Sequence, residues 1–235
     1  MAKVIILTGS GISNESGIPT FRDIDRLWDE HKIEDISENN SLNENRNKII
    51  EFYDEKRFDL KDKTPNYAHK TIAKLKDKYK DDIAIITQNV DDMFEKAGCN
   101  DVLHLHGILR EIRCEECDFI EDIKYEKLDI SRTCPKCQAK LRPNIVFFTE
   151  EAHAYKTMFK EFEDCQMLVV IGTSGAVVNT DYFLSLHLKK TILNNLETST
   201  YIDEKLYDKV LFKKATLAID EIAEDIEEFL LTKKD

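Results

Sequence analysis

The sequence predicts an α/β protein built on a parallel β-sheet. Continuous apolar runs, as expected of strands buried on both faces, recur at residues 4–7, 83–86, 167–171, 191–193 and 215–219. Apolar residues at three- and four-residue spacing, typical of amphipathic helices, occur at Tyr155, Met158, Phe159 and Phe162 and at Ile222, Ile226, Phe229 and Leu230. Buried strands that alternate with such helices indicate a parallel sheet.

Two segments interrupt this alternation. Residues 25–64 are polar and rich in Asn, Glu and Lys, and the apolar residues within 49–53 predict a helix there. Residues 112–142 contain four of the six cysteines and too little apolar material to form a core unaided. We therefore expect a helical insertion in the first segment and another source of stability in the second.

Length, composition and charge limit the class of protein. A chain of 235 residues with 42% hydrophobic residues is long and apolar enough to bury a core, which excludes a disordered protein. A net charge of −12 offers no positive field for a nucleic-acid backbone. No apolar run approaches the length of about 18 residues that spans a membrane, and residues 4–7 are too few for a signal-peptide core. We expect a cytoplasmic protein that binds neither nucleic acid nor membrane, and the sequence leaves its oligomeric state open.

The cysteine spacing predicts a metal site. Two Cys-x-x-Cys pairs, Cys114 with Cys117 and Cys134 with Cys137, have the separation of a four-cysteine zinc ribbon. The alternative is four unrelated core or disulfide cysteines, which their charged neighbours disfavour. Four sulfur ligands leave no open position for water, so we expect one structural zinc ion. The remaining cysteines are expected to be a loop thiol, Cys99, and a core residue, Cys165.

The first apolar run leads into a glycine-rich loop, Gly9-Ser10-Gly11-Ile12. Glycines let the backbone approach a phosphate closely, and a following helix N-terminus offers free N–H groups. A strand followed by such a loop suits a dinucleotide. Because the spacing differs from G-x-G-x-x-G, this loop alone does not distinguish a phosphate site from an ordinary turn.

The longer string from Gly9 to Arg22 resembles the opening motif of the sirtuin family of NAD-dependent protein deacylases. Further matches follow in the family's order, at Thr87-Gln88-Asn89-Val90-Asp91, His104-Leu105-His106-Gly107, the four cysteines, Gly172-Thr173-Ser174, Asn195-Leu196-Glu197 and Ala215. The resemblance covers essentially the whole chain.

This resemblance implies a two-part architecture. A Rossmann-like parallel sheet with helices on both faces would comprise residues 1–24, 65–111 and 143–235. A small domain would combine the helical insertion, residues 25–64, with the zinc ribbon, residues 112–142. NAD and an acyl-lysine would meet in the cleft between them.

The resemblance also implies ligands and the residues that bind them. NAD is the implied co-substrate, and acyl-lysine proteins or peptides are the implied substrates. The residues implied to bind NAD are Gly9, Ser10, Gly11, Ile12, Phe21, Arg22, Gln88, Asn89, Asp91, Gly172, Thr173, Ser174, Asn195, Leu196, Glu197 and Ala215. The residues implied to contact the substrate are Tyr53, Lys56, Val146, Phe147 and Phe148.

A histidine is the expected catalytic base. Transfer of an acyl group to a ribose needs a base for a sugar hydroxyl, and His has an unperturbed pKa close to neutral pH. His104 and His106 are two residues apart and would face the same side of an extended segment, so periodicity does not separate them. The family motif favours His106, directly before Gly107, and places Asn89 and Asp91 among the catalytic residues near the nicotinamide. The implied reaction releases nicotinamide, free lysine and O-acyl-ADP-ribose.

Departures from the family pattern concern the substrate. Met93-Phe94 replaces the usual Leu-His, and Thr149 stands where related bacterial enzymes have Gly. In the branch that removes succinyl and malonyl groups, a Tyr and an Arg three residues later bind the distal carboxylate. Here Tyr53 matches, while Lys56 keeps the charge of the Arg without its planar fork, and Arg57 would substitute only after rotation of the helix. We expect a deacetylase that also removes succinyl and malonyl groups, with an ordinary exposed helix face as the alternative.

Two other functions stay open. Some members of the family transfer ADP-ribose to proteins, and a non-catalytic NAD or ADP-ribose sensor would use the same pocket. The intact His106, Asn89 and Asp91 favour a catalyst, because a sensor needs no base. A nucleic-acid-binding zinc ribbon is disfavoured by the charge of −12.

Overall fold

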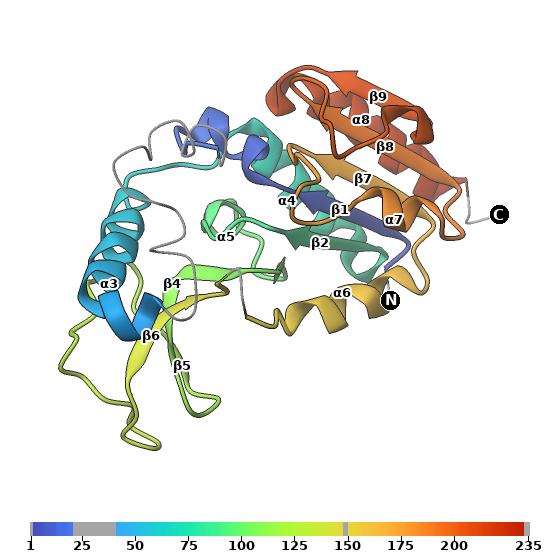
Figure 1. The fold of residues 1–235 in the computed structure, drawn as a ribbon. Helices are drawn as coiled ribbons and strands as arrows, with labels where there is room; N and C mark the ends of the chain where they lie inside the picture. The colour runs from blue at the N-terminus through green and yellow to red at the C-terminus, as the bar shows by residue number, and fades with distance from the viewer. Residues whose placement is uncertain (1, 21–40, 148–149, 233–235) are drawn as a thin grey trace.

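The computed structural model describes residues 2–20, 41–147 and 150–232, and its main element is a six-stranded parallel sheet (Figure 1). In the order in which they lie side by side, the strands are β3 (Leu103–His104), β2 (Ile83–Thr87), β1 (Val4–Thr8), β7 (Met167–Ile171), β8 (Lys190–Asn195) and β9 (Lys209–Phe212). All neighbouring pairs are parallel. The predicted α/β fold and four of its five predicted strands are confirmed.

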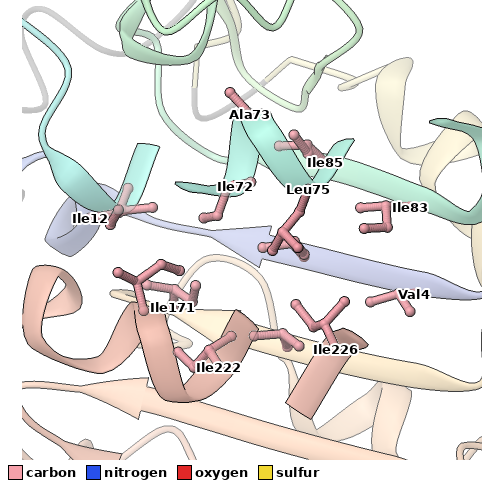
Figure 2. Close-up of a cluster of buried hydrophobic side chains, with 14 of the residues drawn as sticks. Val4, Ile12, Ile72, Ala73, Leu75, Ile83, Ile85, Ile171, Ile222 and Ile226 are labelled. Atoms are coloured by element: carbon pink, nitrogen blue, oxygen red, sulfur yellow. The ribbon is translucent and has the colours of Figure 1, made fainter. Parts of the chain in front are cut away.

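Helices cover both faces of this sheet because its strands are apolar on both sides. Val4 and Ile6 of β1 belong to one buried cluster, shown in Figure 2, together with residues of α4 (Tyr67–Tyr79) and α8 (Ala215–Leu231). Ile5 and Leu7 belong to a second cluster with residues of α6 (Ala154–Phe162) and α7 (Asp181–Leu184). This alternation is the two-residue period of a strand. Within the described part of the chain, no helix combines the length and apolar character needed to cross a bilayer.

The strand predicted at residues 215–219 is wrong. These residues form the first turns of α8, and the last strand of the sheet is β9. The buried residues of α8 recur at helical spacing along its whole length, at Ala215, Ala218, Ile219, Ile222, Ile226 and Leu230. Leu217, inside the predicted strand, is exposed. A short apolar run does not distinguish a strand from the start of a buried helix face, and here the longer helical stripe decides.

A second, antiparallel sheet lies to one side of the first (Figure 1). Its strands, in spatial order, are β5 (Ile120–Asp122), β4 (Gly107–Cys114) and β6 (Leu141–Ile145). The helix predicted around residues 49–53 is part of α3 (Ser41–Asp59), which packs against β4 and β6. The remaining described elements are short: α5 (Met93–Lys96) and 3-10 turns at Ser10–Ile12, Asn14–Ser16, Lys80–Asp82 and Glu204–Leu206.

A buried arginine fixes α3 to the small sheet. The Arg57 side chain is fully buried and donates hydrogen bonds to the Asp54 carboxylate and to the backbone oxygens of Leu109 and Glu126. Asp54 in turn accepts from the backbone N–H of Leu128. These hydrogen bonds hold one face of α3 against the small sheet. The helix therefore cannot rotate to bring Arg57 to the position of Lys56. This orientation decides which α3 side chains reach the candidate site.

Candidate active site

A large cavity lies at the carboxyl ends of the parallel strands. β1 and β7 are neighbours, but the chain continues from β1 toward β2 on one side and from β7 toward β8 on the other. The strand order therefore reverses between β1 and β7, and open α/β sheets bind ligands at such a point. The cavity at this point has a volume of about 1120 Å³ and is also lined by α3 and by residues at the end of β6. This exceeds the range of about 300–1,000 Å³ that is usual for one drug-sized ligand.

Glycines hold the two loops together. A Cβ atom at Gly9 would lie 2.7 Å from the backbone oxygen of Gly172, and one at Gly172 would lie 2.5 Å from the backbone nitrogen of Ile12. Gly172 also has a φ of +66°, which disfavours any other residue. Loop packing thus requires these glycines, in addition to the close approach to a phosphate that the sequence predicts. The surface that the loops leave to a ligand includes Gly9, Ser10, Thr173 and Ser174.

The predicted site residues fall into three sets. The cavity wall contains Gly9, Ser10, Gln88, Asn89, Asp91, His106, Thr173 and Ser174, and toward α3 and β6 it contains Tyr53, Lys56, Val146 and Phe147. Outside this wall lie Gly11, Ile12, Gly172, Asn195, Leu196, Glu197 and Ala215. Asn195 nevertheless supports it, since its Nδ2 donates to the backbone oxygen of Thr173 at 2.9 Å. The residues Phe21, Arg22, Phe148 and Thr149 are outside the described ranges.

A buried polar network positions Asn89 and Asp91. Asn89 Nδ2 donates to the backbone oxygen of Gly9 and to Oγ of Ser13, both at 3.1 Å. Ser13 Oγ donates to Oδ2 of Asp91 at 2.8 Å, which uses its single proton. His69 Nε2, 3.3 Å from the same Oγ, must therefore be the donor. Burial lowers the pKa of His69 to about 3, so this imidazole stays neutral. Burial also raises the pKa of Asp91, while the hydrogen bond from Ser13 acts in the other direction.

The structure separates the two candidate histidines. His104 lies behind the cavity wall, where Nδ1 contacts the backbone oxygen of Asn89 and Nε2 contacts Oε1 of Glu95, each at 3.0 Å. Burial opposes a positive charge on His104, but the hydrogen bond and charge of Glu95 outweigh it and raise its pKa. Both nitrogens face acceptors, which favours the protonated ring and makes His104 poorly suited to act as a base.

His106 lines the cavity, and its pKa is shifted in the opposite direction from that of His104. Its Nδ1 lies 2.9 Å from the backbone oxygen of Gln88, which can only accept, so Nδ1 carries the proton and Nε2 keeps its lone pair. Burial lowers the pKa of His106, with the Gln88 hydrogen bond acting in the other direction. A neutral imidazole with an unprotonated Nε2 is the form that a general base needs. The geometry therefore favours His106 over His104.

The four cysteines form a compact cluster at the end of the small sheet that could hold a metal ion. Their sulfur atoms all lie within 4.8 Å of one another, with Cys114 to Cys137 at 3.4 Å and Cys117 to Cys134 at 3.6 Å. A tetrahedral zinc ion with Zn–S bonds of about 2.3 Å places its ligands about 3.8 Å apart, whereas a disulfide needs about 2.05 Å. Backbone N–H groups of Glu116 and Lys136 point at two of the sulfurs, at 3.4 Å, which favours thiolates. The donor set fits the predicted structural zinc.

α3 places Tyr53 and Lys56 at the far end of the cavity. Tyr53 packs against Phe147 with ring centroids 6.0 Å apart, and burial raises the pKa of its phenol, which therefore stays a hydrogen-bond donor. Lys56 Nζ lies 5.3 Å from the centre of the Phe52 ring, and no carboxylate of the described residues is within ion-pair distance of it. Arg57 is bound to the small sheet and does not line the cavity, so it is excluded as the substituting cation.

Comparison with known proteins identifies the family. A model of the Sir2 family matches residues 9–179. The chain belongs to the Sir2 family. The relatives of this Sir2 protein include an NAD-dependent protein deacylase of Campylobacter jejuni (strain RM1221), 44% identical over 231 residues and 98% of each chain. Another, from Helicobacter hepaticus, is 37% identical over 256 residues, covering 99% of this chain and 100% of the relative.

Solved structures agree with this family assignment. A Sir2 homolog in complex with NAD superposes with a TM-score of 0.82 at 31% identity, covering 97% of this chain and 90% of that one. A Sir2 protein bound to an acetylated peptide superposes with a TM-score of 0.75 at 25% identity, covering 94% of this chain and 92% of that one. The sirtuin resemblance and the Rossmann-like fold predicted from the sequence are confirmed.

Three polar residues of the site have weak or no sequence signals. Ser13 directly follows the glycine-rich loop, and this position is a sequence signal for a residue of the site. His69 and Tyr155 lie on amphipathic helices, where a buried imidazole or phenol looks like part of an ordinary core face. Only the packing of α4 and α6 against the strand ends brings these two side chains to the site.

Proposed function

We propose that this Sir2 protein is an NAD-dependent protein-lysine deacylase that releases nicotinamide and O-acyl-ADP-ribose. The observation that carries the proposal is His106, a neutral imidazole whose Nε2 has a lone pair, in the wall of a cavity at the switch point of the sheet. The names of the Campylobacter and Helicobacter relatives support the activity. The solved complexes of relatives with NAD and with an acetylated peptide support the two substrates.

Different parts of the cavity wall suit different parts of NAD. Backbone and hydroxyl groups of Gly9, Ser10, Thr173 and Ser174 suit pyrophosphate and ribose oxygens. NAD supplies a ribose carbon that becomes electrophilic as nicotinamide leaves. Asn89 and Asp91, held by the Ser13 network, are the preorganised polar groups that we place near this developing charge.

His106 performs the proton transfer in this proposal. Its Nε2 accepts the proton of a ribose hydroxyl, which then becomes able to take the acyl group from the lysine. Burial lowers the pKa of the imidazole and so favours its neutral form. In the same proposal the parallel sheet binds NAD, and the small domain of α3 and the zinc ribbon closes the acyl-lysine side.

The proposed activity is tested with three peptides that carry acetyl-, succinyl- or malonyl-lysine. We expect loss of the acyl group only when NAD is present, with one nicotinamide and one O-acyl-ADP-ribose formed for each lysine released. Mass spectrometry measures the deacylated peptide, nicotinamide and O-acyl-ADP-ribose, together with any ADP-ribose attached to protein. ADP-ribose attached to protein with the acyl group retained would instead indicate a transferase, and NAD binding without turnover would indicate a sensor.

We propose further that Tyr53 and Lys56 bind the distal carboxylate of a succinyl or malonyl group. A carboxylate that enters a partly buried pocket needs a charged or hydrogen-bonding partner. Tyr53 and Lys56 are one helical turn apart on the wall formed by α3 and provide a donor and a cation. The nearby Arg142 does not serve, because its guanidinium is paired with Glu150 at 2.6 Å.

Lys56→Arg is expected to raise the ratio of succinyl to acetyl kcat/KM roughly tenfold, because a planar fork adds a second charge-assisted hydrogen bond. Tyr53→Phe is expected to lower the same ratio by about threefold or more through loss of one donor. Matched acetyl and succinyl peptides provide the measurement. Lys48→Arg, on an exposed face of α3, is the control and leaves the ratio unchanged. If neither Tyr53 nor Lys56 variants change the ratio, the carboxylate site is refuted.

A further inference from the structure

Tyr155 contacts the imidazole of His106 across the cavity wall. The Tyr155 hydroxyl oxygen lies 3.2 Å from Nε2 of His106, and the two ring centroids are 6.2 Å apart with an interplanar angle of 34°. Both side chains line the cavity. Nε2 is the nitrogen that accepts the proton in the proposed reaction, so Tyr155 touches the reactive atom of the base.

The direction of this hydrogen bond follows from the other nitrogen. Nδ1 of His106 donates to the backbone oxygen of Gln88, so the neutral ring has no proton on Nε2. The Tyr155 hydroxyl is therefore the donor and Nε2 the acceptor. Burial raises the pKa of Tyr155, so its proton stays in place over the neutral pH range.

The packing of α6 determines where this hydroxyl lies. Tyr155 is in the first turn of α6, and Met158 and Phe162 of the same helix are buried in the cluster that contains Leu105. Leu105 directly precedes His106 in the chain, and α6 packs against β3, which ends at His104. The phenol and the imidazole are thus carried by two elements that share one core, which limits their relative movement.

We propose that Tyr155 is a positioning residue for His106, whose hydroxyl holds Nε2 at the cavity wall until a ribose hydroxyl of the substrate replaces it. This proposal rests on the proposed deacylase function. When Nε2 takes the ribose proton, the ribose O–H bond breaks and an Nε2–H bond forms. Once the ribose oxygen bonds to the acyl carbon and leaves Nε2, the Tyr155 oxygen can accept from that N–H, because a hydroxyl both donates and accepts. Tyr155 thereby supports both protonation states of the base without itself losing a proton.

Comparison of two reactions, nicotinamide exchange and deacylation, tests this role. In nicotinamide exchange, nicotinamide is released and labelled nicotinamide is incorporated into NAD. This exchange precedes the step that needs the base. Tyr155→Phe is expected to lower kcat for deacylation by roughly three- to tenfold, the effect of one hydrogen bond, while nicotinamide exchange stays within about twofold. Tyr182→Phe is the control, because Tyr182 packs against Phe159 of α6 but lies outside the cavity wall. Equal losses of exchange and deacylation in Tyr155→Phe, or no loss of either, would overturn the proposal.

A spectroscopic measurement on the substrate-free protein makes the test independent of activity. In the ¹⁵N spectrum of labelled imidazoles, with His106 assigned by its absence in His106→Ala, an accepted hydrogen bond shifts Nε2 upfield. We expect Tyr155→Phe to move this resonance downfield and Tyr182→Phe to leave it in place. An unchanged resonance in Tyr155→Phe would contradict the hydrogen bond itself. Absence of NAD-dependent deacylation in the unaltered protein, with the expected shift present, would contradict the proposed function and not the hydrogen bond.

Discussion

Replacing His106 by alanine is expected to lower NAD-dependent deacylation by roughly 100- to 10,000-fold, the usual contribution of a positioned general base. NAD affinity is expected to stay within about tenfold, or about 1.4 kcal/mol, of the unaltered protein. The reason is that different residues of the cavity wall bind the nucleotide and transfer the proton. The loops around Gly9 and Thr173 present the groups suited to the nucleotide, and these loops are held together by their own backbone contacts, independently of the imidazole.

Two measurements check the His106 prediction. Calorimetry gives the NAD affinity of folded His106→Ala, and kcat/KM for an acetyl peptide gives the activity. His187→Ala, an exposed histidine outside the cavity wall, is the control and keeps both. A folded His106→Ala protein unable to bind NAD would show that the two roles are not separate.

The pH dependence provides a further check on the base. His106 acts in its neutral form, and burial lowers its pKa below the ordinary imidazole value. The unaltered enzyme should therefore keep its activity slightly below the pH at which a free imidazole becomes protonated, and lose it as the pH falls further. The residual activity of His106→Ala should lack this loss.

Replacing Cys134 by alanine is expected to remove the zinc ion and unfold the small antiparallel sheet. The buried cluster of the small sheet includes only a few aliphatic residues, Ile50, Ile112, Leu128 and Leu141, together with the ligands Cys114 and Cys134. Such a core stabilises little by itself, whereas a structural zinc ion contributes on the order of 10 kcal/mol or more. Ile50 belongs to α3, so loss of this cluster also displaces the helix that carries Tyr53 and Lys56.

Metal analysis, limited proteolysis and activity measure this effect together. We expect one zinc ion for each unaltered chain and less than about a tenth of that in Cys134→Ala, given the high affinity of four-thiolate sites. We also expect cleavage within residues 112–142 and loss of deacylation. Cys99→Ala is the matched control, because Cys99 is buried in the core of the large sheet and is not one of the four clustered cysteines. Full zinc content and activity in Cys134→Ala would refute the metal assignment.

The strands of the large sheet were predictable because a strand buried on both faces leaves a continuous apolar run. The same rule failed at residues 215–219, where the run begins a helix, because five residues contain too few periods to separate the two structures. β3 and β9 escaped prediction for a related reason: these edge strands have two and four residues, and their side chains are only partly buried.

The sequence by itself determined the properties that depend on residue type and spacing along the chain. Two Cys-x-x-Cys pairs specify a metal site because each pair folds into one local turn, and the ordered motifs from Gly9 to Ala215 specify the family. Tertiary structure alone decided which side chains meet. His104 and His106 are indistinguishable by periodicity. Packing brings Glu95 to His104, where it raises the pKa, and buries His106, where burial lowers it. Likewise, Arg57 is turned away from the cavity and Tyr155 is turned toward it because α3 and α6 are held by contacts with residues more than 40 positions away. Such long-range contacts leave no periodic trace in a single sequence.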